Sequence, residues 1–329
     1  MKKVAIIGKQ QPLYIRERMK SMLEGRGFET DILYMPTRNT ADFKNELEGY
    51  HAIISAGEEF PKETFEYLKD LELVSRFGVG TNEIDKVAAT KEGIAVCNAA
   101  GSFSKCVAEC ALALMLNLIR DFVNCEKDFR KGDWSRFFEG RNARQLSGKT
   151  VGLIGFGDIS QALAKMLGGF ECRLLAYDPF MNEDAAKRLN VTYASMDLLR
   201  KESDIISLHL PLNNDTQEMI DKKFLDGLKE NVILINTSRG KLINEQDVAE
   251  YLKSGKLSAY GADVFSKEPP AEDNPLLSAP RTMLLPHSGS NGIESVEYAG
   301  EFAARNVIDF FEGKDVKTIL NKDYVKNKR

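Results

Sequence analysis

The chain has 329 residues, is 43% hydrophobic and 29% charged, and carries a net charge of −4, a composition that suits a globular protein with room for two hydrophobic cores. Lysines and arginines are dispersed, so the charge pattern indicates neither a nucleic-acid partner nor a membrane partner. Met1–Gly8 has too few apolar residues for a signal peptide, and the apolar run Val107–Ile119 is too short for a membrane span. The five cysteines follow no pattern, which favours reduced thiols in a cytoplasmic protein and no metal site.

Strands and helices alternate along the whole chain, which predicts an α/β fold. A first block has a predicted helix at Tyr14–Gly25 and predicted strands at Val4–Ile7, Thr30–Tyr34, Ala52–Ser55, Leu73–Arg76 and Ala95–Cys97. A helical region from Ser104 to about Arg130 leads to a second series of strands, and the last predicted helix is Ser295–Glu312. The strands of the second series are Thr150–Ile154, Arg173–Tyr177, Ile205–His209, Val232–Asn236, Ser258–Val264 and Thr282–Leu285.

The segment VGLIGFGDIS, residues 151–160, has the parts of a dinucleotide-binding turn. A short strand leads into Gly155 and Gly157, a helix with an apolar face follows, and Asp178 comes after the next strand. An acid at that distance binds the ribose hydroxyls of a dinucleotide. The third glycine of the motif is replaced by Ser160, which is small enough to let the helix pack on the strand.

The acid also bears on the choice of cofactor. A carboxylate at Asp178 would repel a 2′-phosphate, and the next residues, Pro179 to Met181, include no arginine to hold one, so NAD is favoured over NADP. Asp158 stands at the helix N-terminus, where it suits the helix dipole but would repel the pyrophosphate. We therefore expect its carboxylate to point to solvent.

Chemistry at an alcohol carbon needs a group that handles the proton and, for an acid substrate, a cation. Ligands bind at the carboxyl ends of strands in such sheets, so His209 and His287 both qualify, whereas His51 precedes a strand. Arg239, Asp263 and Glu268 also follow strands of the second series. We expect these side chains to gather at one edge of a sheet.

The segments NTSRG, GADVFSKEPP and LPHSGS, in that order after VGLIGFGDIS, resemble the D-isomer-specific 2-hydroxyacid dehydrogenase family. RFGVGTNEID (76–85) resembles its substrate loop, and NAAGSFSKCVAECALALML (98–116) its interdomain helix, so the resemblance covers nearly the whole chain. It implies an α/β fold in which a Rossmann-type doubly wound parallel sheet is inserted into a flavodoxin-like substrate domain. The expected boundaries are 1–100 with 291–329 for the substrate-binding domain and 101–290 for the NAD-binding domain.

The resemblance also implies an NAD-dependent oxidoreductase that interconverts a small D-2-hydroxy acid and its 2-keto acid, working as a homodimer paired through its cofactor domains. Arg239 would bind the substrate carboxylate and carbonyl, and His287 would be the acid in reduction and the base in oxidation. Glu268 would hydrogen-bond His287 and raise its pKa. Backbone N–H groups of Gly78, Val79 and Gly80 would hold the carboxylate.

A longer set of residues is implied for the cofactor, in which Asp263 would hold the nicotinamide amide, and Thr237 and Ser238 would line the site. The whole set is Gly155, Gly157, Asp158, Ile159, Asp178, His209, Pro211, Thr216, Thr237, Ser238, Asp263, Ser288 and Gly289. Two departures from the family are the acidic residue at Asp158, where a base is common, and Cys110, where a histidine is common.

The loop SAGEEF, residues 55–60, lacks the arginine that phosphoglycerate dehydrogenases often carry there. Its Glu58 and Glu59 would repel a phosphorylated acid, so we expect glyoxylate, hydroxypyruvate or pyruvate to be preferred over 3-phosphohydroxypyruvate, unless Arg38 or Lys105 supplies the missing charge. Phosphoglycerate dehydrogenase activity stays an alternative. A second alternative is an NAD-sensing corepressor, because such members of the fold keep the Arg-Glu-His set.

Overall fold

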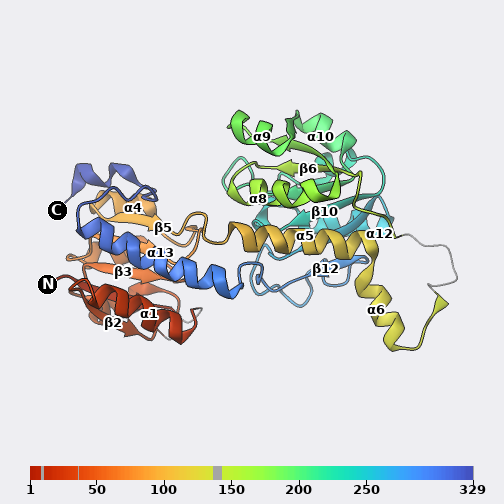
Figure 1. Cartoon of the computed structure of the whole chain (residues 1–329). Coiled ribbons are helices and arrows are strands. Elements are labelled where there is room, and N and C mark those ends of the chain that lie inside the picture. The colour runs from red at the N-terminus through yellow and green to blue at the C-terminus, as the bar shows by residue number, and fades with distance from the viewer. Residues whose placement is uncertain (9–10, 36, 136–142, 329) are drawn as a thin grey trace. The chain divides into compact units, whose positions relative to one another are not determined.

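The computed structural model of the chain describes residues 1–8, 11–35, 37–135 and 143–328 (Figure 1). The chain divides into two compact units. Met1–Phe103 and Asn291–Arg329 form what we call the terminal unit, and Ser104–Ser290 form the central unit. The terminal unit is therefore built from both ends of the chain, with the central unit inserted between them.

The terminal unit contains a five-stranded parallel sheet in the order β2-β1-β3-β4-β5, which is the flavodoxin-like order. Its strands are β1 (Lys3–Ile7), β2 (Glu29–Leu33), β3 (Ala52–Ser55), β4 (Leu73–Arg76) and β5 (Ala95–Asn98). The three strands β3, β4 and β5 are continuous apolar or small-residue runs and are almost wholly buried, because helices cover both faces of a parallel sheet.

The last long helix completes the terminal unit. After the whole central unit, α13 (Ile293–Phe311) packs against α1 (Leu13–Glu24), β3 and β4 (Figure 1). Small residues allow this close approach: a Cβ at Gly300 would lie 2.6 Å from Ile15 of α1. The other helices of this unit are η1 (Thr40–Phe43), α2 (Lys44–Leu47), α3 (Lys62–Tyr67), α4 (Lys86–Lys91) and η4 (Lys322–Asn327).

The central unit contains a seven-stranded parallel sheet in the order β12-β11-β10-β9-β6-β7-β8. The chain starts at β6, fills one side of the sheet and then crosses to the other side at β9, which is the Rossmann-type doubly wound arrangement. The expected fold class is confirmed. Its strands are β6 (Thr150–Ile154), β7 (Arg173–Tyr177), β8 (Val191–Tyr193), β9 (Ile205–Leu208), β10 (Val232–Asn236), β11 (Leu257–Ala262) and β12 (Thr282–Leu284).

The helix α5 (Ser104–Arg120) packs against α8, β10 and β11 of the same unit. Ala108, Ala111, Leu114 and Met115 are fully buried in that contact, which accounts for the apolar run in the sequence. Within the described residues, no helix is long and apolar enough to cross a membrane. The remaining helices among the described residues of the unit are α6 (Phe122–Arg130), α8 (Asp158–Leu167), η2 (Gly168–Phe170), α9 (Glu183–Leu189), α10 (Met196–Glu202), α11 (Lys222–Asp226), η3 (Gly240–Leu242) and α12 (Glu245–Ser254).

Two local predictions need correction. The sequence does not predict the three-residue strand β8, because it is too short to show a strand pattern and its middle residue, Thr192, is exposed. The strand predicted at Ile205–His209 ends at Leu208, so His209 belongs to the loop that follows β9. The other predicted strands are present, with ends shifted by about one or two residues, the usual uncertainty of such boundaries.

Candidate active site

In the turn between β6 and α8, Gly155 packs tightly against neighbouring backbone, whereas the space beside Gly157 is empty. Gly155 has φ +93°, and a Cβ there would lie 2.7 Å from the backbone of His209, so only glycine fits. Gly157 caps α8, and the space around its Cβ position is empty to 4 Å. A ligand can therefore approach the backbone at Gly157 and the first amides of α8, as a pyrophosphate does in a dinucleotide-binding turn.

Asp178 is tied to this turn by both of its carboxylate oxygens. Oδ2 accepts the N–H of Phe156 at 2.7 Å, and Oδ1 accepts the N–H of Phe180 at 2.8 Å. Each oxygen keeps a lone pair for a second donor such as a ribose hydroxyl. Asp158 is exposed, in line with the expectation that it points to solvent, and Ser160 is fully buried between helix and sheet.

The loops after β9 and β10 are joined at the same edge of the sheet. Ser238 Oγ donates to the carbonyl of Leu210 at 2.5 Å, and Thr216 Oγ1 donates to the carbonyl of Pro211 at 2.7 Å. Thr237 Oγ1 is buried and has no hydrogen-bond partner in the described part of the chain. Such an orphaned polar atom fits a site completed by a bound polar molecule, so the residues present suit a dinucleotide.

Arg239 follows β10 and is held by its own loop. Its Nη1 donates to the carbonyl of Ser238 at 2.7 Å, and its backbone carbonyl accepts Asn236 Nδ2 at 3.0 Å. The next residue, Gly240, touches the loop after β11: a Cβ there would lie 1.8 Å from the backbone of Phe265. Only glycine brings these two loops this close, and the Phe265 loop carries Glu268.

His287 and Glu268 form the central pair of the site. His287 Nδ1 and Glu268 Oε2 are 2.6 Å apart, and the two side chains are 49% and 37% exposed. Glu268 Oε1 accepts the N–H of Phe265 at 3.1 Å, which fixes the carboxylate. A histidine held through Nδ1 has Nε2 left for another partner.

The electrostatics of the pair favour a charged histidine. The hydrogen bond from Glu268 raises the pKa of His287, and burial and the charge of Arg239 only partly oppose it. Burial by itself would raise the pKa of Glu268, but the hydrogen bonds from His287 and the Phe265 N–H, with the charges of His287 and Arg239, hold that pKa below its usual value. Arg239 is therefore close enough to act on both partners, and the structure brings the three predicted residues together.

Asp263 clamps the segment that carries His287. Its carboxylate accepts the N–H of Ser288 at 2.7 Å and the N–H of Gly289 at 2.8 Å, and its side chain is almost fully buried. Burial raises the pKa of Asp263, against the effect of the two amides. No local pattern in the sequence predicts these two hydrogen bonds. Cys110 lies beside Gly289, and burial, with the nearby charge of Asp263, raises its pKa to about 12, so it stays a thiol.

The other two histidines differ from His287 in their pKa. His51 Nδ1 accepts the N–H of Lys3, and burial, followed by the charge of Lys2, lowers its pKa. Burial lowers the pKa of His209 to about 4, and its Nε2 has no partner among the described residues. Both are neutral at physiological pH, so of the two candidates left open by the sequence only His287 is suited to donate a proton. Among the described residues, no group of three or more His, Cys, Asp or Glu could hold a metal ion.

The loop after β4 in the terminal unit presents three successive backbone amides. The carbonyl of Gly78 accepts the N–H of Ala99 at 2.9 Å, that of Val79 accepts Asn98 Nδ2 at 2.8 Å, and that of Gly80 accepts Arg76 Nε at 3.0 Å. The three N–H groups have no acceptor in the described part of the chain. A run of free amides of this kind suits an anion.

The loop after β3 differs from the expectation in one respect. Glu58 is buried, and its carboxylate accepts the N–H of Ala56 at 2.8 Å and lies against Gly8, so it is not presented at the surface of the loop beside Glu59. Glu59 is exposed. Arg38 Nε donates to the carbonyl of Gly57 at 2.8 Å, which places a guanidinium on this loop.

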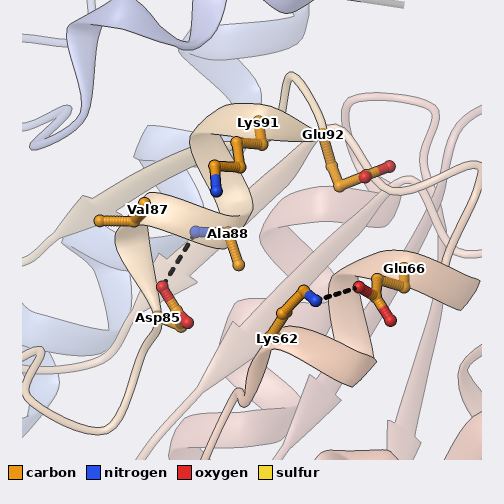
Figure 2. Close-up of a pocket in the computed structure, with 7 residues that line it drawn as sticks. All are labelled: Lys62, Glu66, Asp85, Val87, Ala88, Lys91 and Glu92. Atoms are coloured by element: carbon orange, nitrogen blue, oxygen red, sulfur yellow. Dashed lines mark hydrogen bonds and ion pairs between the residues drawn. The ribbon is translucent and has the colours of Figure 1, made fainter.

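A pocket in the terminal unit lies between α3 and α4 (Figure 2). Three of its polar side chains are already engaged: Lys62 forms an ion pair with Glu66 at 2.9 Å, and Asp85 accepts the N–H of Ala88 at 2.9 Å. It contains none of the predicted site residues. The pocket is lined by Lys62, Glu66, Asp85, Val87, Ala88, Lys91 and Glu92.

Comparison with known proteins agrees with this geometry. Residues 112–289 match the model of the D-isomer specific 2-hydroxyacid dehydrogenase, NAD binding domain. A glyoxylate reductase of Korarchaeum cryptofilum is 36% identical over 266 residues, which is 80% of each chain. A D-3-phosphoglycerate dehydrogenase of Archaeoglobus fulgidus is 32% identical over 93% of this chain but only 58% of its own length. The crystal structure of a glyoxylate reductase from Paecilomyes thermophila covers 98% of both chains with a TM-score of 0.85 and 26% identity.

Proposed function

Because the chain belongs to the D-isomer-specific 2-hydroxyacid dehydrogenase family, we propose that Arg239, Glu268 and His287 are its catalytic group. The protein is an NAD-dependent oxidoreductase that interconverts a small D-2-hydroxy acid and the corresponding 2-keto acid. The observation that carries the proposal is the 2.6 Å contact between His287 Nδ1 and Glu268 Oε2, with the charge of Arg239 acting on both.

NADH, when bound, supplies the hydride for reduction of the keto carbon. His287 donates the proton from Nε2 to the carbonyl oxygen, because Nδ1 is occupied by Glu268. Glu268 stabilises the protonated imidazole before transfer and fixes its orientation. In the oxidation direction, neutral His287 accepts the hydroxyl proton at Nε2. Arg239 pairs with the substrate carboxylate and polarises the carbonyl, a task that suits its planar fork of donors.

This proposal assigns residues 101–290 to NAD binding. The backbone at Gly157 and the first amides of α8, those of Asp158 and Ile159, would hold the pyrophosphate, and Asp178 would bind the ribose hydroxyls. The rest of the site would be lined by Gly155, His209, Pro211, Thr216, Thr237, Ser238, Ser288 and Gly289. Asp263 can accept the nicotinamide amide besides its two backbone amides, since each oxygen has a second lone pair.

Residues 1–100 and 291–329 are assigned to substrate binding. The free amides of Gly78, Val79 and Gly80 take the substrate carboxylate. Their carbonyls are all engaged inside the terminal unit, which supports a preformed anion site, because the loop does not have to be ordered when the substrate binds.

The exposed apolar residues of α6 support a homodimer formed through the central unit more strongly than the apolar sequence of α5 does. One face of α5 packs into the core of its own unit. In contrast, α6 has no buried residue, and Phe122, Val123, Phe129 and the nearby Trp134 are 45–59% exposed. Phe129 and Trp134 touch, with ring centroids 5.5 Å apart. An exposed apolar cluster of this kind is typical of a surface covered in an assembly. We place the dimer in the cytoplasm.

Substrate choice has two candidates. A small unphosphorylated acid such as glyoxylate or hydroxypyruvate agrees with exposed Glu59 on the loop after β3. A phosphorylated acid is favoured by Arg38, whose Nε donates to the carbonyl of Gly57 and whose guanidinium has the donors to pair with a phosphate dianion. Both loops, after β3 and after β4, lie at the same edge of the terminal sheet, because Phe77 N–H donates to the carbonyl of Ser55.

The deciding experiment is reduction of glyoxylate, pyruvate, hydroxypyruvate and 3-phosphohydroxypyruvate by NADH, with wild-type protein and Arg38→Gln. Turnover of the unphosphorylated acids that is indifferent to Arg38→Gln supports the first candidate. A preference for the phosphate ester that Arg38→Gln removes supports the second. NADH binding without turnover of any acid would contradict the enzymatic proposal and favour a corepressor-like protein.

A further inference from the structure

Asn98, the last residue of β5, reaches the loop that follows the neighbouring strand β4. Its Nδ2 donates to the carbonyl of Val79 at 2.8 Å. The side chain is 6% exposed, so this hydrogen bond is shielded from water. Of the three groups that hold the carbonyls of the Gly78–Gly80 loop, Asn98 is the one neutral side chain: the others are the backbone N–H of Ala99 and the guanidinium of Arg76.

The planarity of the peptide bond links this contact to the free amides. The carbonyl of Val79 and the N–H of Gly80 belong to one peptide unit and point in opposite directions when that unit is trans. A donor that fixes the Val79 carbonyl therefore also fixes the direction of the Gly80 N–H. In the same way, the Ala99 N–H holds the Gly78 carbonyl and thereby sets the Val79 N–H.

The choice of asparagine is hard to explain by stability alone. Asn98 Oδ1 is buried and has no hydrogen-bond partner among the described residues. A buried acceptor without a partner is destabilising, and an apolar side chain of the same size would avoid this penalty. What such a side chain could not do is donate to the Val79 carbonyl.

Asn98 is itself held from the far end of the chain. Asn306 of α13 is buried, and its Nδ2 donates to the carbonyl of Asn98 at 3.0 Å. Thr318 Oγ1 donates in turn to Asn306 Oδ1 at 3.2 Å. A continuous series of hydrogen bonds thus runs from the returning C-terminal segment through β5 to the loop after β4, all within the terminal unit.

We propose that Asn98 is a positioning residue for substrate binding: by holding the Val79 carbonyl it aims the Gly80 N–H at the substrate carboxylate. The proposal deepens the assignment of the Gly78–Gly80 loop as the carboxylate site and rests on it. Asn98 touches neither substrate nor cofactor in this account and acts only through the peptide unit.

The test compares Asn98→Leu with Asn321→Leu. Asn321 is a matched control, because its side chain also holds β5, through the N–H of Val96 at 2.8 Å and the carbonyl of Ile94 at 2.9 Å, but has no contact with the loop after β4. For each variant, the measurements are KM for hydroxypyruvate, the inhibition constant of oxamate against it, KM for NADH, and the melting temperature. Oxamate reports carboxylate binding without turnover.

Asn98→Leu should raise KM for hydroxypyruvate and the inhibition constant of oxamate by the same factor, about tenfold or more, as expected for a misaimed hydrogen bond to a charged group. KM for NADH should change by less than about twofold, because the proposal assigns NADH binding to other residues. Asn321→Leu should lower the melting temperature and leave the constants for both acids unchanged. Asn306→Leu should give the same pattern as Asn98→Leu, with a smaller effect.

Unchanged constants for hydroxypyruvate and oxamate in a folded Asn98→Leu protein would overturn the proposal, as would equal changes in the acid and NADH constants. If Asn98→Leu does not fold, Asn98→Ser is measured by the same criteria, since serine is too short to reach the Val79 carbonyl. Failure of the wild-type protein to reduce any 2-keto acid would instead refute the proposed function.

Discussion

Replacing Asp178 by asparagine should weaken the preference of the enzyme for NADH over NADPH. Asparagine keeps the size of the side chain and one oxygen that can accept the Phe156 N–H, while the negative charge is lost. Alanine is a poorer choice. Both carboxylate oxygens of Asp178 accept backbone N–H groups, and an alanine side chain would remove both hydrogen bonds and loosen the turn after β6.

The magnitude follows from the position of the carboxylate. At a separation of about 4 Å, two unit charges repel by about 1 kcal/mol in water and about 4 kcal/mol near a protein surface. Because each 1.4 kcal/mol is tenfold, removing the charge should reduce the ratio of kcat/KM for NADH to that for NADPH by roughly 5-fold to 10³-fold. Asp178 is partly exposed, so the lower part of this range is expected.

The assay is steady-state reduction of one keto acid with each cofactor, for wild-type protein, Asp178→Asn and Asp204→Asn. Asp204 is a suitable control, because it also accepts a backbone N–H, that of Thr150, but precedes β9 at the amino edge of the sheet. The improved use of NADPH by Asp178→Asn should appear as a lower KM for NADPH. Asp204→Asn should keep the wild-type ratio of kcat/KM for the two cofactors. Equal kcat/KM for both cofactors in the wild-type protein, or an unchanged ratio in Asp178→Asn, would refute the reasoning.

Three further predictions concern catalysis and assembly. His287→Ala should lower kcat by roughly 10²–10⁴ with little change in the KM of the acid, whereas Arg239→Ala should raise that KM as well, since Arg239 binds the ground state too; near-normal turnover in both variants would show that the residues are wrongly assigned. Glu268 raises the pKa of His287, so Glu268→Gln should lower that pKa. Because reduction needs protonated His287 and oxidation needs the neutral form, kcat/KM for reduction should fall, and kcat/KM for oxidation should rise, at a lower pH than in the wild type. The pH profiles of kcat/KM in the two directions measure this. Phe129→Asp should shift the protein from dimer to monomer in light scattering at micromolar concentration, and a monomeric wild type would contradict the proposed assembly.

The sequence predicted those parts of the site that follow from local pattern. Gly155 and Asp178 stand in a fixed order of strand, turn, helix and strand, so their meeting at one edge could be expected, and the structure has Asp178 bound to the turn through the Phe156 N–H. His287 could not be separated from His209 by position, because both follow strands. Burial separates them, and burial depends on which loops fold over each ring.

Asn98 shows what local pattern does not contain. A single asparagine at the end of an apolar strand has no periodicity, and its partners in the fold, Val79 and Asn306, are 19 and 208 positions away in the chain. The pairing of β4 with β5 brings Val79 to Asn98, and the return of α13 to the terminal sheet adds Asn306. The same is true of Asp263, whose two bonds to the His287 segment cross 25 and 26 positions.

The loop after β3 shows that formal charges counted in the sequence do not tell which charged side chains are exposed. Two consecutive acids suggest a negative loop, but consecutive residues in an extended segment point to opposite sides, and here Glu58 faces the interior while Glu59 is exposed. The buried carboxylate then contributes to the shape of the loop through the Ala56 N–H, and the charge presented outward is that of Glu59 together with Arg38, whose Nε is held by Gly57. Because one exposed acid and one anchored guanidinium oppose each other, formal charge does not decide between a phosphorylated and an unphosphorylated substrate. The decision depends on the direction of the Arg38 fork, and substitution of that one residue separates the two.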